Sequence, residues 1–418
     1  MAALATGMLT LAGIIVFGEP ATANHLDCGS VVTSSVTLDR DLGPCDGDGL
    51  VVQGSNITLN LGGHTLTGNN TANFGVEEQA GIHLIGASRV TVRNGTVRNF
   101  DAGVVIDGGS GNTVTGVLAQ DNANHVVHTG ALNPCEFADG ILILDSSNNR
   151  IQGNRAIHNG PFGGIDIVGN SDGNVVTGNI SDLHNIPNFH PSLITEENEE
   201  GLGPCGPFGG GSTVGRLNQG IGIRVEGPGS DNNRVEMNTV RDNILYGIAV
   251  HGYVCHPPGP FPPQPNNGGN TIRRNNALHN GYAGPEELGD GIAVLSQGPA
   301  AIVCVAFGNS IVQNTSIDNA GHGIFLGGRG SHSNNISGNV VRDNGLDGIR
   351  VTGPGGPTSR CGVVLTMPCP GAVNNTLRGN VGSANGEHDA HDGNPNCDNN
   401  AWRNNRFGTV FRGCERNG

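Results

Sequence analysis

Short blocks of alternating apolar and polar residues recur along the chain in a fixed order. The most regular block is a glycine, an isoleucine or valine, a variable residue and an aliphatic residue, as in Gly81-Ile82-His83-Leu84 and Gly247-Ile248-Ala249-Val250. Because side chains alternate between the two faces of a strand, the aliphatic residues share one face and the variable residue points to the other. Uninterrupted copies begin 22 to 25 residues apart (positions 81 to 103, 140 to 164, 222 to 247 and 323 to 348).

Two further patterns follow each copy: a block N-x-V/I-x-x-N, and a short apolar pair that ends in Asp-Asn or His-Asn. Three short strands in 22–25 residues are typical of one coil of a parallel β-helix, whereas leucine-rich repeats need helical returns that this chain lacks. The sequence therefore predicts an all-β, single-domain, right-handed parallel β-helix of roughly a dozen coils. Stacked coils would align the last Asn of the second pattern in a structural ladder of Asn154, Asn179, Asn238, Asn275, Asn314, Asn339 and Asn380. We expect this Asn to adopt the left-handed turn, and the Gly before Ile to form the other bend.

The repeat also divides the chain. We assign residues 24–68 to an N-terminal cap and first coil, 69–385 to the β-helix, and 386–418 to a C-terminal cap. Insertions interrupt the repeat at 123–138, 184–219, 252–269, 281–289, 297–308 and 353–373. Such loops often gather on one face of a solenoid and build its binding groove.

The first 23 residues have the features of a secretion signal. An apolar run from Leu4 to Phe17 precedes Ala21-Thr22-Ala23, which is a signal-peptidase type of site. The alternative is a membrane anchor, but the run is shorter than the ~20 residues that span a bilayer. We expect a secreted protein with no membrane contact after cleavage.

The ten cysteines fit an oxidising compartment, where disulfides are stable. Their positions predict the pairs Cys28–Cys45, Cys361–Cys369 and Cys397–Cys414, and make Cys255 and Cys304 plausible partners. The only tryptophan, Trp402, and Phe407 are expected to cover the C-terminal end of the core.

The charged residues of the chain exclude some chemistries and some classes of partner. The chain has 21 Arg, no Lys and a net charge of −15, which excludes lysine chemistry and disfavours nucleic acids and other polyanions. The partner expected for such a surface is a polysaccharide or a cell-surface glycan, bound by a monomer.

Candidate chemistry lies on the outward positions of the first pattern. Functional polar types concentrate there on adjacent coils, at Asp166, Arg224, Glu226 and His251. Carboxylates about 5–10 Å apart can cleave a glycosidic bond. A lyase would instead use Arg to hold a sugar carboxylate and a base to remove the neighbouring proton. The alternative is that these outward side chains are simply solvated.

A second candidate cluster uses the residues before the Gly-Ile pairs, Tyr246, Asp290, His322 and Asp347, together with Arg350. Its alternative is a structural one, because Asp-Gly and His-Gly are common in bends.

The repeat resembles the right-handed parallel β-helix repeat superfamily, which includes pectate lyases, polygalacturonases, alginate epimerases and NosD-type proteins. The resemblance covers roughly residues 49–385 and implies the fold, not a reaction. The ends are similar to those of uncharacterised secreted bacterial β-helix proteins. Gly321-His322-Gly323 and Arg350 are similar to a polygalacturonase signature, but Thr352 stands at its Lys position and its adjacent acid pair is missing.

The sequence leaves three functions open: a polysaccharide lyase or glycoside hydrolase, a non-catalytic glycan-binding module, and a structural surface protein. It assigns no cofactor. Calcium dependence stays open, although no strand face carries the clustered acidic residues of a pectate-lyase Ca²⁺ site.

Overall fold

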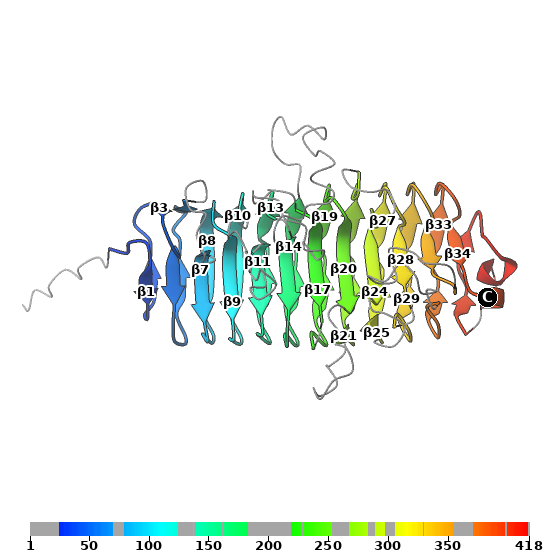
Figure 1. Ribbon diagram of the computed structural model, residues 1–418, viewed down its shortest axis with the longest axis horizontal. Coiled ribbons are helices and arrows are strands. Elements are labelled where there is room, and N and C mark those ends of the chain that lie inside the picture. Colours follow the sequence, from blue (N-terminus) through cyan, green and yellow to red (C-terminus); the bar gives the residue numbers. More distant parts are fainter. Residues whose placement is uncertain are drawn as a thin grey trace, which may run out of the picture.

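The chain forms a rod of stacked coils that runs from the N-terminal to the C-terminal end (Figure 1). The computed structural model describes residues 25–69, 79–123, 137, 139–160, 162–182, 219–227, 229–252, 267–282, 289–296, 306–328, 330–354, 371–397 and 399–416. The predicted insertions, with Cys255, Cys304, Cys361 and Cys369, lie almost entirely outside these residues. In the described part, no helix has the length and apolar character needed to cross a membrane.

One face of the rod is a sheet of twelve parallel strands, here called the long sheet, each contributed by a successive coil. This confirms the predicted solenoid and its number of coils. Its strands, in spatial order, are β1 (Ser30–Val32), β4 (Leu50–Val52), β7 (Ala80–Ile85), β9 (Ala102–Asp107), β11 (Asp139–Leu144), β14 (Gly163–Val168), β17 (Ile221–Glu226), β20 (Tyr246–Gly252), β24 (Ile292–Ser296), β28 (Ile324–Gly327), β31 (Ile349–Val351) and β34 (Ala390–Asp392).

The other two strands of each coil build two further parallel faces. The second face contains β2 (Val36–Thr37), β5 (Thr58–Asn60), β8 (Thr91–Arg98), β10 (Thr113–Gln120), β12 (Arg150–Gln152), β15 (Val175–Thr177), β18 (Arg234–Glu236), β22 (Thr271–Arg273), β26 (Ser310–Val312), β29 (Asn335–Ser337), β32 (Thr376–Arg378) and β35 (Ala401–Arg403). The third face contains β3 (Leu42–Cys45), β6 (Thr65–Gly68), β13 (Arg155–Ile157), β16 (Ile180–Asp182), β19 (Thr239–Arg241), β23 (Asn276–Leu278), β27 (Thr315–Ile317), β30 (Val340–Arg342), β33 (Val381–Ser383) and β36 (Arg406–Phe407), and the long strands β8 and β10 run through both faces. A short pair, β21 (Asn267–Gly268) and β25 (Ala306–Phe307), and the 3₁₀ turns η4 (Pro395–Cys397) and η5 (Gly413–Arg416) complete the described elements.

The inward residues form a single aliphatic core, as the alternation predicts. In the long sheet Ile165, Ile223 and Ile248 stack in register and are fully buried. The predicted ladder is also confirmed, because each Asn from Asn154 to Asn380 donates its Nδ2 to the Oδ1 of the Asn in the next coil at 3.0–3.1 Å.

Two more ladders run parallel to the predicted one. The first Asn of the N-x-V/I-x-x-N block forms one of them, for example Asn149 to Asn174 to Asn233. The Asn that ends the third pattern forms the other, for example Asn243 to Asn280 to Asn319. Asn at all three bends therefore satisfies the buried backbone groups that each turn leaves unpaired.

The two expected roles at the bends need correction. The left-handed conformation falls on the residue before the ladder Asn, such as Arg274 (φ 53°) before Asn275, because the Asn itself must turn inward to reach the next coil. The glycines before Ile do not have positive φ. They allow coils to approach closely: a Cβ on Gly247 would lie 2.6 Å from the carbonyl oxygen of Gly291.

The rod is closed at both ends. Residues 24–68, predicted as a cap and one coil, contain two coils, because β1 already pairs with β4. The disulfides Cys28–Cys45 and Cys397–Cys414 are confirmed. The segment 386–418 adds a further coil, β34 to β36, and Trp402 covers its core with its Nε1 donating to Asp392.

Candidate active site

Four neighbouring strands of the long sheet bring polar side chains together on its outward face. Asp139 begins β11, Asp166 lies in β14, Arg224 and Glu226 lie in β17, and His251 lies in β20. Asp166 is in register with Arg224, and Glu226 with His251. We call these five residues the acid–arginine cluster; it contains all four residues of the first predicted site.

Arg224 is the centre of this cluster. Its Nε and Nη2 donate to one oxygen of Asp166 at 2.7 and 2.5 Å, and its Nη1 donates to Glu226 at 2.6 Å. Its guanidinium also lies over the ring of Phe162, 4.8 Å from the centroid, which adds a cation–π contact. The arginine thus holds two carboxyl groups, one on each side.

Asp139, which the sequence analysis missed, forms a carboxyl pair with Asp166. Both are fully buried, and one oxygen of each (Oδ2 of Asp139 and Oδ1 of Asp166) has no hydrogen-bond donor when both groups are ionised. Burial, the charge of Asp166 and a hydrogen bond to it raise the pKa of Asp139 well above its usual value. A proton held on Asp139 would supply the donor that this carboxyl pair lacks.

The other two members differ in protonation. Burial raises the pKa of Glu226, although the charge of Arg224 opposes this rise. Burial and the charge of Arg224 lower the pKa of His251 to about 3, so its imidazole is neutral at neutral pH. The cluster thus combines an acid that retains its proton more readily than usual, a carboxylate paired with arginine, and a neutral imidazole. The reading of these residues as merely solvated fails for Asp166, which has no exposed surface.

The proton on Asp139 has a measurable consequence for stability. The folded protein holds a proton that the unfolded chain releases above a pKa near 3.8, so the free energy of unfolding falls as pH rises from about 4 towards the folded pKa. An Asp139→Asn variant keeps a donor for Asp166 but has no proton to lose. As pH rises through this window, we expect the free energy of unfolding of Asp139→Asn to increase relative to that of the parent by up to about 1.4 kcal/mol per pH unit. Urea unfolding at pH 4, 5.5 and 7 checks this, and parallel curves for the two proteins would contradict it.

The second predicted cluster is only partly brought together. His322, Asp347 and Arg350 meet, since the backbone N–H of Asp347 donates to His322 at 3.0 Å and Arg350 donates to Asp347 at 3.2 Å. Asp290 accepts the backbone N–H of His322 at 2.8 Å. Tyr246 lies elsewhere, edge-on to the ring of His251. An apolar patch between the two clusters is made by Ile221, Tyr246, Ala249, Ala293, Leu295 and Phe325.

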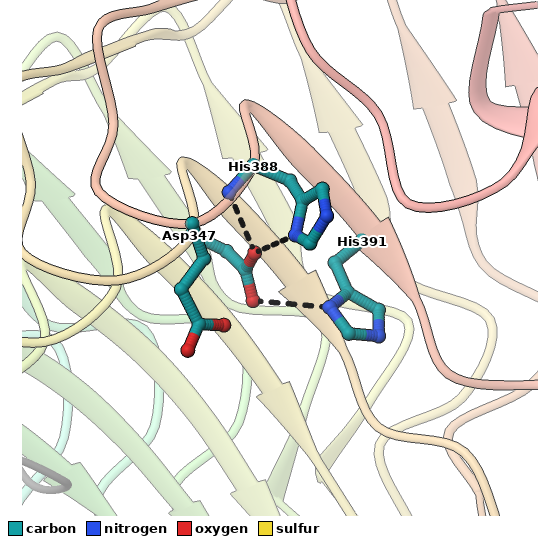
Figure 2. Close-up of side chains that lie close together, drawn as sticks. Asp347, His388 and His391 are labelled. Carbon is teal, nitrogen blue, oxygen red and sulfur yellow. Dashed lines mark hydrogen bonds and ion pairs between the residues drawn. The ribbon is translucent and has the colours of Figure 1, made fainter.

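Two histidines that the sequence analysis missed complete this second group. His388 and His391 lie 3.2 and 3.4 Å from the two oxygens of Asp347 (Figure 2). For His391, the register of the repeat contains a signal. His391 occupies the same outward position as Arg350 one coil later, but Asp389-Ala390 replaces the Gly-Ile that marks the strand.

Neither cluster fits a calcium ion. Ca²⁺ prefers six to eight oxygen ligands. In the acid–arginine cluster the carboxyl groups of Asp166 and Glu226 already face Arg224, and the second cluster offers imidazoles.

Comparison with known proteins agrees with this architecture. Residues 28–187 match the family described as right handed beta helix region. The same coils continue beyond that match to β36. The chain is a right-handed parallel β-helix. No curated protein sequence matches this β-helix.

Among solved structures, the Dettilon tailspike protein is similar, with a TM-score of 0.54 and 13% identity over 92% of this chain and 60% of its own. The β-helix therefore spans less than two thirds of the tailspike's length. DFA-IIIase from Arthrobacter chlorophenolicus aligns with a TM-score of 0.48 and 13% identity over 85% of this chain and 81% of its own. The mannuronan C-5 epimerase A-module from Azotobacter vinelandii has a TM-score of 0.47 and 15% identity over 80% and 84%. At these identities the likeness concerns the fold alone.

Proposed function

We propose that this protein is a secreted glycoside hydrolase that cleaves a neutral polysaccharide at the acid–arginine cluster. One observation carries the proposal: Arg224 holds Asp166 and Glu226 on its two sides, at 2.5 and 2.6 Å, in an environment that raises the pKa of Glu226. Two carboxyl groups of different protonation are the machinery of glycoside hydrolysis.

The geometry suits this chemistry. Two nitrogens of one guanidinium hold the Asp166 and Glu226 oxygens at 2.5 and 2.6 Å, so the two carboxyl groups lie close together, as in the acid pairs about 5–9.5 Å apart that act on glycosidic bonds. Glu226 would donate its proton to the leaving oxygen. Asp166, held by Arg224, would act on the anomeric carbon directly or through water. Asp139 would be a positioning residue that fixes Asp166.

Access to the two acids differs. The side chain of Glu226 is 10% exposed, whereas that of Asp166 has no exposed surface. The sugar would therefore enter from the Glu226 side, and Asp166 would gain access as the substrate binds.

The same geometry disfavours elimination at this cluster. A lyase for acidic sugars needs a guanidinium that is free to hold the sugar carboxylate. Both sides of Arg224 are taken by protein carboxyl groups. The net charge of −15 also repels a polyanionic substrate, which favours a neutral glycan.

Secretion is part of the proposal. The disulfides Cys28–Cys45 and Cys397–Cys414 close the two ends of the rod, and such bonds persist in oxidising compartments.

The direct test is a depolymerisation screen of the purified protein on neutral and acidic polysaccharides. We expect new reducing ends on a neutral polysaccharide, with no ultraviolet-absorbing unsaturated ends and no requirement for calcium. Unsaturated ends would mean elimination and contradict the assigned roles. Glycan binding without cleavage would instead support the non-catalytic alternative.

A further inference from the structure

The last two coils of the long sheet gather metal-ligating side chains that the proposed hydrolase does not use. Asp347 precedes β31, Glu387 and His388 precede β34, and His391 lies within β34. One ligand atom from each of these four residues lies within 4.8 Å of the others. Figure 2 shows both imidazoles directed at the carboxylate of Asp347.

The spacing within this group suits a small, borderline-soft ion. Nδ1 of His388 lies 3.2 Å from one oxygen of Asp347, and Nδ1 of His391 lies 3.4 Å from the other. With bonds of about 2.0–2.2 Å, ligands of tetrahedral Zn²⁺ are about 3.3–3.5 Å apart. Two imidazoles with carboxylates favour Zn²⁺ over Ca²⁺ or Mg²⁺, which prefer oxygen ligands only.

The ligands are already positioned by the surrounding structure. Asp347 is fully buried, and its backbone N–H is fixed by His322 at 3.0 Å. The ring of His391 stacks on Phe411 with 3.8 Å between centroids. The backbone N–H of His388 donates to Asp347 at 3.1 Å. Little ordering would be needed on binding, which favours affinity.

The guanidinium of Arg350 contacts two of these proposed ligands, Asp347 and His391. Nη1 of Arg350 is 3.2 Å from the Asp347 oxygen that faces His391, and it also contacts the ring of His391. The Arg350 side chain is 26% exposed, so it can leave for solvent without losing a buried environment. Its guanidinium and a metal ion would compete for the same oxygen and the same imidazole.

We propose that Asp347, His388 and His391, with Glu387 from the exposed side, bind Zn²⁺ in exchange for the guanidinium of Arg350. The bound ion ties β34 to β31 and thereby holds the last coil and the C-terminal cap on the rod. The proposal does not depend on the hydrolase assignment.

Isothermal titration of the full-length protein with Zn²⁺ tests the proposal. We expect one site per chain, at least 100-fold weaker binding in Asp347→Asn, and at least 10-fold weaker binding in His388→Ala, whose side chain is partly exposed and whose loss spares the fold. Arg350→Ala should bind Zn²⁺ at least 5-fold more tightly, because the competing cation is gone. Zn²⁺ should also raise the thermal midpoint of the parent protein, and Ca²⁺ should not.

His279 provides a matched control. It pairs with Asp242 at 2.7 Å on the surface, much as His388 pairs with Asp347. His279→Ala should therefore leave Zn²⁺ affinity unchanged. The proposal is overturned if neither the parent nor Arg350→Ala binds Zn²⁺ at millimolar concentration, or if His279→Ala weakens binding as much as His388→Ala does.

Discussion

Replacement of Glu226 by Gln is expected to lower kcat for glycoside hydrolysis by roughly 10²- to 10⁴-fold, the usual contribution of a general acid. The introduced amide would retain an oxygen for Nη1 of Arg224, so the fold should survive while the transferable proton is lost. Asp166→Asn should cause a loss of similar size, because the amide cannot supply the negative charge. Initial rates of reducing-end release at saturating polysaccharide measure both effects.

A matched control lies on another face of the rod. Glu236 in β18 is also buried between arginines, Arg234 at 2.7 Å and Arg273 at 2.6 Å, but those contacts lower its pKa and it lies away from the long sheet. Glu236→Gln should leave kcat within about twofold of the parent. If Glu226→Gln keeps most of the activity, or falls no further than Glu236→Gln does, Glu226 is not the acid.

The largest expected effect on stability comes from the predicted Asn ladder. In Asn275→Asp the carboxylate would face the carbonyl of Val235 and the Oδ1 of Asn314, which now accept from Nδ2 at 2.9 and 3.0 Å. A buried, unpaired charge replaces two hydrogen bonds, so we expect a loss of about 3–5 kcal/mol. Thermal unfolding at neutral pH, followed by circular dichroism, measures it.

The next residue serves as the comparison, because it points the other way. Asn276 is exposed, so Asn276→Asp should change stability by less than about 0.5 kcal/mol. Equal midpoints for the two variants would mean that the ladder does not carry the stability assigned to it.

Much of the fold could be predicted because every coil buries aliphatic residues and forms Asn hydrogen bonds at the same positions of the repeat. Burial of Ile165 and Ile223, and the hydrogen bonds from Asn154 to Asn179, follow from the spacing of the motifs. The backbone conformation at the bends was harder to predict. Arg274 adopts a left-handed conformation that its residue type does not favour, so only its place in the coil reveals it.

The sites could be predicted only as far as the repeat marks them. Asp166, Arg224 and Glu226 occupy positions whose direction the alternation determines, and they do meet. Asp139 was missed because the candidate residues before Gly-Ile were taken only from Tyr246 onwards, and its pairing with Asp166 depends on the path of the side chain. His391 was missed because the last coil lacks the Gly-Ile mark. The insertions follow no repeat, and spacing therefore says nothing of their form.

The Asn ladders also give the rod an electric dipole along its axis. Where the side-chain bonds of a ladder run on from coil to coil, each amide accepts on its Oδ1 from the preceding coil and donates from its Nδ2 to the Asn of the next, so these amide dipoles align as peptide dipoles do in a helix. The positive end of each column therefore lies at the C-terminal end. Two columns end there on a carboxylate: Asn385 donates to Asp389 at 2.7 Å, and Asn400 donates to Asp392 at 3.0 Å. These two aspartates therefore interact with the positive ends of their columns as an acidic N-cap residue interacts with the N-terminus of a helix.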